Sequence, residues 1–215
     1  CNAIIRSNDN HLVMGCKNTK IPNSVTSILE YAFCGCTSLK KMVLPFVGSS
    51  TIIIIAISGS SAGAIIVMQA EYEICNKTSW TSTLPEGFRY AGVMSFSGAI
   101  LSREGKVDYR RLTPAPTLML HGTADELVPY KQIAVFNLGF FGGGKLVERF
   151  EKFGYNYNMY HFLDYGHEIA GSMPTTMDLQ LRFLQTNVME GKKRIIEAWI
   201  SDPDVYKGFG PQSRK

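Results

Sequence analysis

The feature that most constrains the fold of this chain is the pentapeptide Gly-Ser-Ser-Ala-Gly at residues 59–63, which directly follows an apolar run over residues 51–57. The run is short and rich in isoleucine, which predicts a buried strand. The residues that follow predict a helix from Ala62 to about Cys75. A G-x-S-x-G turn between a strand and a helix is so tight that its serine is strained and its hydroxyl exposed. Ser61 is therefore the first candidate for a reactive side chain.

The residues around Ser61 support this prediction. We expect Gly59 and Gly63 to be required because side chains at these positions would collide with the strand and helix that pass close by. The expected helix points its positive N-terminal end at charge that develops near Ser61, and the backbone N–H of Ala62 is a candidate oxyanion donor. The pentapeptide alone is not specific, since a chance match is expected in roughly one chain of this length in ten.

Two later segments supply an acid and a base. An apolar strand over residues 115–120 opens into a polar loop that contains Asp125, and a β-rich run over residues 155–163 is followed by His167. Serine, acid and histidine in this order, each after a strand, is the arrangement of a nucleophilic triad on such a sheet. Imidazole titrates near neutrality, so His167 is suited to accept the serine proton, and Asp125 would fix its tautomer. We predict a triad of Ser61, Asp125 and His167.

Each role has competitors in the sequence. Two neighbouring serines lie outside the register of the pentapeptide, two acids compete with Asp125, and three further histidines are expected to be structural, one of them supporting the acid loop. Those competitors are Ser58, Ser60, Asp108, Glu126, His11, His121 (the acid-loop histidine) and His161. Trp80 and Tyr130 are candidates to line an acyl pocket, whereas Phe96 is better interpreted as core. Residues 97–111 are a candidate lid.

The motifs carry a family resemblance over residues 51 to about 200. The segments Gly-Ser-Ser-Ala-Gly-Ala, His-Gly-Thr-Ala-Asp-Glu-Leu-Val-Pro-Tyr and Gly-His-Glu-Ile-Ala resemble those of bacterial α/β-hydrolase esterases. The resemblance is closest to the carboxyl-terminal part of gut and rumen feruloyl (cinnamoyl) and acetyl-xylan esterases. It implies Ser61 as nucleophile, Asp125 as acid and His167 as base. The implied reaction is hydrolysis of feruloyl or acetyl esters on plant cell-wall polysaccharide through an acyl-enzyme, without cofactor or metal.

The amino-terminal residues resemble a different family. Ile21-Pro22 recurs as Leu44-Pro45 and Gly15-Cys16 recurs as Gly35-Cys36, a period in the low twenties that is normal for leucine-rich repeats. Residues 11–45 are similar to the BspA-like leucine-rich repeats of bacterial surface proteins. Because about three such units are needed for a stable solenoid, this segment is incomplete by itself.

The hydrolase part also departs from its family's pattern. Such enzymes normally have several strands before the serine turn, and a loop after the third strand, often His-Gly-Gly, supplies a second oxyanion N–H. No such motif precedes Ser61. We expect an α/β fold with a mostly parallel sheet flanked by helices, lacking its early strands. The expected units are a leucine-rich-repeat-like segment at residues 1–47 and a hydrolase domain at 48–215. A fragment, a natural fusion and a misassembled reading frame remain open.

A truncated sheet has a physical consequence at its edge. Without earlier strands, residues 51–57 would form an uncovered apolar edge, which is an association hazard. We therefore predict that this edge pairs either with the amino-terminal segment or with another copy of the chain, giving a homo-oligomer.

The composition fits a globular protein and excludes several classes. With 215 residues, of which 45% are apolar, the chain can bury one sizeable core. A net charge of +4 and one solvated basic cluster at residues 192–194 do not indicate a nucleic-acid site, and no run is long enough for a membrane span. The five cysteines favour reduced, packed thiols and show no zinc spacing. The chain opens at Cys1 without a signal peptide, and its resemblances indicate a secreted, periplasmic or cell-surface bacterial protein.

The remaining segments are expected to complete the α/β order. Residues 140–145 are interpreted as a flexible connection. Residues 177–188 carry the apolar face of one helix, which starts near Thr175 and stops at Gly191, and residues 193–200 are interpreted as another helix. Three functions stay open. The first is a serine carboxylic-ester hydrolase, and the second is a catalytically impaired surface or interaction protein on a truncated hydrolase scaffold. The third is a prolyl-oligopeptidase-like peptidase, disfavoured because Ser60 and Ala62, not an aromatic residue, flank Ser61.

Overall fold

The computed structural model describes residues 4–8, 11–14, 21–22, 24–25, 27–28, 55–135 and 138–201. The chain divides into two compact units, Cys1–Ile53 and Ile54–Lys215. In the first unit, a small sheet has the order β1-β2-β3, with β1 antiparallel to β2 and β2 parallel to β3. Its strands are β1 (Ile4–Arg6), β2 (His11–Met14) and β3 (Ser27–Ile28). Most of the predicted repeat positions lie outside the described residues, so the leucine-rich-repeat resemblance stays a prediction.

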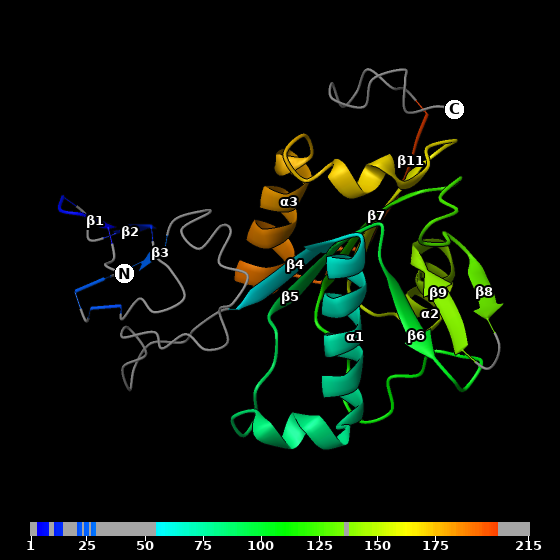
Figure 1. Ribbon diagram of the computed structural model, residues 1–215, viewed down its shortest axis with the longest axis horizontal. Helices are drawn as coiled ribbons and strands as arrows, with labels where there is room; N and C mark the ends of the chain where they lie inside the picture. The colour runs from blue at the N-terminus through cyan, green and yellow to red at the C-terminus, as the bar shows by residue number, and fades with distance from the viewer. Residues whose placement is uncertain are drawn as a thin grey trace. The chain divides into compact units, whose positions relative to one another are not determined.

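The second unit is built on a five-stranded sheet with the order β11-β10-β7-β5-β4 (Figure 1). Every pairing in this sheet is parallel. The strands are β4 (Ala56–Ser60), β5 (Gly92–Phe96), β7 (Thr117–Gly122), β10 (Tyr157–Phe162) and β11 (Ile196–Ile200). The unit is therefore of the α/β class, as the sequence predicts.

Helices cover both faces of this sheet. Neighbouring residues of each strand point to opposite sides, so β5, β7 and β10 contribute to both cores. On one face, Val93 and Met119 pack in a core with side chains of α1 and α2. On the other, Met94 and Leu118 pack in a second core with α3. The helices are α1 (Ala62–Asn76), α2 (Gly143–Lys152) and α3 (Met177–Phe183), with 3-10 helices at η1 (Ser79–Thr83) and η2 (His167–Gly171).

A second, antiparallel sheet corrects two predictions. It has the order β6-β9-β8 and consists of β6 (Ala99–Ser102), β9 (Leu138–Gly142) and β8 (Gln132–Val135). The segment interpreted as a flexible connection forms the end of β9 and the start of α2, because Phe141 is buried in the core shared with α2. The candidate lid at residues 97–111 contains β6, whose four residues pair with β9.

The carboxyl-terminal elements also differ from the prediction. Residues 193–200 do not form a helix, because β11 pairs with β10 and buries alternate residues, Ile196, Ala198 and Ile200, against the α3 core. The helix expected over residues 177–188 is divided into α3 and a π-helical segment, Leu184–Met189.

Strand β4 is the last strand of the five-stranded sheet. Within the described residues it begins at Ala56 and pairs only with β5, so its outer edge faces no described strand. Residues 51–54, which carry most of the predicted apolar edge, lie outside the description. Pairing of this edge with a second copy stays a prediction.

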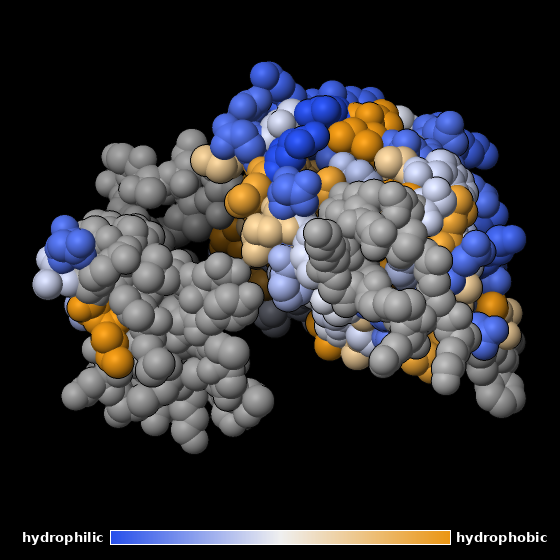
Figure 2. Space-filling view, turned by 90° about the horizontal axis from the view of Figure 1, so that it is seen from above, coloured by the Kyte–Doolittle hydropathy of each residue, from blue (hydrophilic) through white to orange (hydrophobic). Residues whose placement is uncertain are grey.

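The described surface mixes polar residues with separate apolar ones. Figure 2 shows hydrophilic residues interspersed with smaller hydrophobic patches on one face. Among the exposed apolar side chains are Leu127, Ile66 and Trp199, at 77%, 67% and 56% exposure. In the described part of the chain, no helix is long and apolar enough to cross a membrane. Of the five cysteines, Cys75 is described, and it is a buried free thiol.

Candidate active site

Ser61 occupies the turn between β4 and α1. Its backbone has φ 53° and ψ −121°, a strained conformation that a non-glycine residue adopts rarely. The amide N–H of Ser61 donates to the carbonyl of Phe96, 3.0 Å away at the end of β5, and its carbonyl accepts from Ile65 inside α1. These bonds fix both sides of the turn, so the hydroxyl is held at the carboxyl edge of the sheet.

The two glycines of the turn differ in their roles. A Cβ at Gly59 would lie far inside van der Waals distance of the Gly63 carbonyl and 2.7 Å from the amide nitrogen of Ala64. Gly59 is therefore required by the close approach of strand and helix. At Gly63 a Cβ would meet no atom within 4 Å, so the expectation of a collision there was wrong.

His167 reaches Ser61 from the loop after β10. It is the first residue of η2, its side chain is 22% exposed, and its Nε2 lies 2.8 Å from Ser61 Oγ. The opposite ring nitrogen, Nδ1, lies 2.9 Å and 3.1 Å from the two carboxylate oxygens of Asp125. A carboxylate only accepts hydrogen bonds, so Nδ1 carries the proton and Nε2 is free to accept from the serine hydroxyl. The predicted triad residues thus form one continuous hydrogen-bonded chain.

Asp125 is buried behind His167, in the loop after β7. Its Oδ1 accepts backbone N–H bonds from Leu127 and Val128, each at 3.0 Å. Burial raises the pKa of Asp125, but the hydrogen bonds from His121, His167 and Val128 outweigh it and lower this pKa to about 2. The group is therefore a carboxylate throughout the neutral range.

A second histidine, His121, also contacts Asp125. His121 is 1% exposed, and its Nδ1 accepts the backbone N–H of Gly143 at 3.1 Å. Its proton must therefore be on Nε2, which lies 2.9 Å from the Val128 carbonyl and 3.4 Å from Asp125 Oδ2. These contacts hold His121 between Gly143, Val128 and Asp125, so it supports the acid loop as the sequence indicates.

The competitors identified in the sequence have other partners. Ser60 donates its hydroxyl to the Ala170 carbonyl, Ser58 is exposed, and Glu126 is exposed beside the buried Asp125. Asp108 pairs with Lys106 and Arg149, and His161 bonds Tyr130 and Glu197. None of these contacts involves Ser61 or His167.

The N-terminal end of α1 lies at the triad. Ala62 is the first residue of this 15-residue helix, and the amides of a first helical turn have no acceptor inside the helix. The Ala62 N–H and the helix dipole are thus available to a negative charge beside Ser61. Residues 29–54, which precede this turn, lie outside the described residues.

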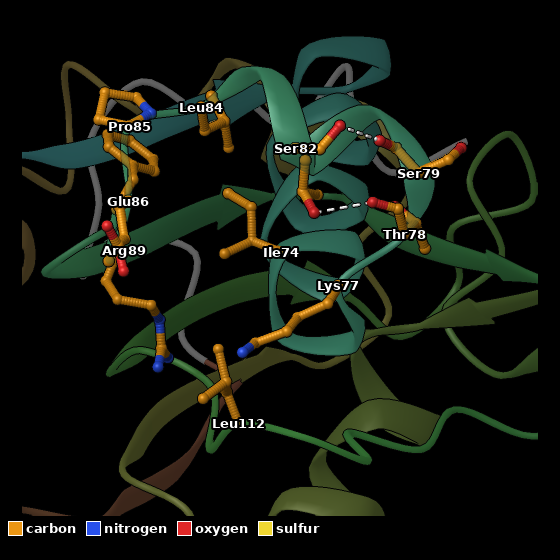
Figure 3. Close-up of a pocket in the computed structure, with 13 residues that line it drawn as sticks. Ile74, Lys77, Thr78, Ser79, Ser82, Leu84, Pro85, Glu86, Arg89 and Leu112 are labelled. Atoms are coloured by element: carbon orange, nitrogen blue, oxygen red, sulfur yellow. Dashed lines mark hydrogen bonds between the residues drawn. The ribbon is translucent and has the colours of Figure 1, made fainter.

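A cavity of about 650 Å³ lies at the opposite end of α1 (Figure 3). Its lining includes Ile74 and Lys77 from the end of the helix, together with residues of the segment that contains η1 and Trp80. A 15-residue helix is about 20 Å long, so this cavity is not part of the triad site. Trp80 belongs to this far end, and Tyr130 is buried against His161. Phe96 lies next to Ser61 through its backbone carbonyl, but its side chain is buried in the core.

The described residues contain no cluster of three or more His, Cys, Asp or Glu side chains with metal-binding geometry. Comparisons with protein-family models, with characterised proteins and with solved structures find no match to this chain.

Proposed function

We propose that this protein is a serine carboxylic-ester hydrolase with an α/β-hydrolase-type fold over residues 48–215. The observation that carries the proposal is the hydrogen-bonded chain Ser61–His167–Asp125, with contacts of 2.8 Å and 2.9 Å, at a strained strand-to-helix turn. A serine without a catalytic role would not require a positive φ, nor a histidine partner that is bonded to a buried carboxylate. Strain of this kind is retained where it serves a site.

In the proposed reaction, Ser61 Oγ attacks the ester carbonyl carbon while its proton moves to His167 Nε2. The Ala62 N–H and the α1 dipole stabilise the oxyanion that forms. His167 then gives its proton to the departing alcohol, leaving an acyl group on Ser61. A water molecule, deprotonated by His167, attacks this acyl-enzyme and releases the acid with regeneration of the serine. Asp125 holds the imidazole in the required tautomer and stabilises its positive charge throughout.

The substrates we propose are feruloyl or acetyl esters of plant polysaccharide, in line with the motifs around Ser61, Asp125 and His167. The same resemblances support a secreted, periplasmic or cell-surface bacterial protein with a leucine-rich-repeat-like segment at residues 1–47. No metal or organic cofactor takes part in the proposed reaction.

The test is ester hydrolysis measured under pre-steady-state conditions. With p-nitrophenyl acetate we expect a burst of one p-nitrophenolate per chain followed by slower turnover, and with methyl ferulate we expect steady release of ferulate. Ser61→Ala abolishes both, whereas Ser58→Ala, a change at an exposed serine in the middle of β4, leaves both unchanged. Faster cleavage of a prolyl p-nitroanilide than of either ester would favour the peptidase instead.

The second candidate is a catalytically impaired surface or interaction protein. It is favoured by one observation: Ala62 is the one oxyanion donor identified in the described residues, and loss of a donor costs about a hundred- to thousandfold in rate. A well-folded chain without a burst and without turnover would support this candidate.

A further inference from the structure

A second site lies on the face of the sheet that α2 covers. A cavity of about 480 Å³ opens between α2 and the edge strand β11. Glu197 and Trp199 of β11 point to the same side as His161, because Trp199 pairs with His161 in the parallel register. Both of these β11 residues are exposed. The cavity is therefore bordered by a helix on one side and by an open aromatic residue on the other.

The floor of this cavity is held by a ring stack and two side-chain hydrogen bonds. The indole of Trp199 stacks on the imidazole of His161, with ring centres 3.9 Å apart and planes at 15°. His161 is 1% exposed and is held at both nitrogens: Nδ1 lies 2.6 Å from the Tyr130 hydroxyl and Nε2 lies 3.0 Å from Glu197 Oε1. One face of the indole is covered, so its 56% exposure belongs to the opposite face and the ring edge.

The rim of the cavity is polar and of mixed charge. Glu148 and Glu151 line it from α2, and Lys131 and Gln132 line it from the start of β8. Lys145 also lines it and is paired with Glu148 at 2.5 Å. The rim thus offers carboxylate acceptors, ammonium donors and an amide beside one flat aromatic surface.

We propose that this cavity binds a neutral glycan, with a pyranose ring stacked on the open face of Trp199 and its hydroxyls bonded to the carboxylates, lysines and amide of the rim. A pyranose has a C–H face that packs on an aromatic ring and a periphery of hydroxyls that both donate and accept. The cavity has the complementary layout, and its volume is within the range of small-ligand sites.

Other ligand classes fit less well. A phosphate or polyanion would face the carboxylates of Glu148, Glu151 and Glu197. An organic cation would have one aromatic face instead of a cage and would be opposed by Lys131 and Lys145. An apolar ligand would leave the charged rim without partners. A neutral polyhydroxylated ligand uses every part of the lining.

The glycan site is separate from the triad, and the inference does not depend on ester hydrolysis. Trp199 lies on one edge strand of the sheet, and Ser61 follows the other edge strand. Four strand spacings of about 4.8 Å separate these edges by about 19 Å. A glycan held at Trp199 would thus occupy a site distinct from any ester at Ser61.

The first experiment uses Trp199 as its own reporter. The chain has two tryptophans, so Trp80→Phe leaves Trp199 as the only indole. We expect xylohexaose or cellohexaose to change the fluorescence of this variant in a saturable manner. No change with either oligosaccharide at millimolar concentrations would overturn the proposal. A response to tetramethylammonium chloride but to neither oligosaccharide would also overturn it.

The second experiment locates the site by calorimetry of the full chain. Trp199→Ala should weaken oligosaccharide binding by about tenfold or more, because one stacked face is lost. The matched control is Trp80→Ala, an exposed tryptophan at the far end of α1, which should bind as the wild type does. Unchanged binding by Trp199→Ala would refute the location.

Labelling of Ser61 by a fluorophosphonate separates the two proposals. Trp199→Ala should label at the wild-type rate, which also shows that this variant is folded. An unlabelled wild type that still binds the oligosaccharide through Trp199 would contradict the proposed ester hydrolase and leave the glycan site supported.

Discussion

Replacing Asp125 by asparagine tests the geometry of the site most specifically. Asparagine keeps an oxygen that accepts the backbone N–H groups of Leu127 and Val128, so the loop retains its anchors. Its amide nitrogen then faces His167 Nδ1, to which Asp125 Oδ2 is now 2.9 Å away. An amide N–H donates, so Nδ1 must become the acceptor and the imidazole proton must move to Nε2. In that tautomer His167 cannot take the proton of Ser61.

Two effects of different size contribute to the loss. The net lowering of the pKa of Asp125 to about 2 shows that its surroundings favour the charged form, and asparagine lacks this charge. The wrong tautomer raises the total loss to about ten-thousandfold, the size found for this change in a serine protease triad. A much smaller loss would therefore indicate a charge effect without a tautomer change.

The assay is the second-order rate of fluorophosphonate labelling, together with kcat/KM for p-nitrophenyl acetate. Glu126→Gln is the matched control, because it removes an exposed carboxylate at the adjacent position. We expect the control to stay within about twofold of the wild type, as surface changes usually do. A folded Asp125→Asn variant that keeps its rate within about tenfold would refute the triad geometry.

Three further predictions concern stability. Gly59→Ala should lower the free energy of unfolding by about 1–3 kcal/mol through overpacking. Gly63→Ala should raise it by about 0.5–1 kcal/mol, because this helical position is open. Thermal denaturation of the two variants checks both, and equal effects would contradict the turn geometry. The folded pKa of Asp125 is below its unfolded value, so its contribution to stability is present above about pH 4 and is lost as the pH falls toward about 2. Urea titrations at several pH values should show this loss of stability, and Asp125→Asn should lack this pH dependence. Burial raises the pKa of Glu71, so the folded state favours the protonated form and stability is lost as the pH rises. Glu71→Gln should therefore be more stable than the wild type at about pH 8 but not at about pH 4. An equal difference in stability at both pH values would contradict a buried charge at Glu71.

The sequence is informative where a motif is local. The strand, turn and helix around Ser61 are each determined by neighbouring residues, and the order of Ser61, Asp125 and His167 along the chain fits a parallel sheet. The α/β class follows from the same alternation of strands and helices. These features depend on short segments, so no long-range information was needed to predict them.

The sequence is less informative where tertiary packing decides. Residues 193–200 contain helix-forming residues, but Ile196, Ala198 and Ile200 find a buried partner face only as a strand beside β10. For this reason no sequence pattern indicated that Trp199 stacks on His161, because the helix prediction placed Trp199 beside different neighbours. The role of Gly63 was also misjudged, since the collision at this turn involves a Cβ at Gly59 and the backbone of residue 63.

The central claim is that Ser61 is an activated nucleophile. Its most direct test is the intact mass of the chain after treatment with a fluorophosphonate, for the wild type, Ser61→Ala and Ser60→Ala. We predict one adduct on the wild type and on Ser60→Ala, whose hydroxyl bonds Ala170 instead of the triad, and none on Ser61→Ala. A folded wild type without an adduct, or an adduct that persists in Ser61→Ala, would contradict the account.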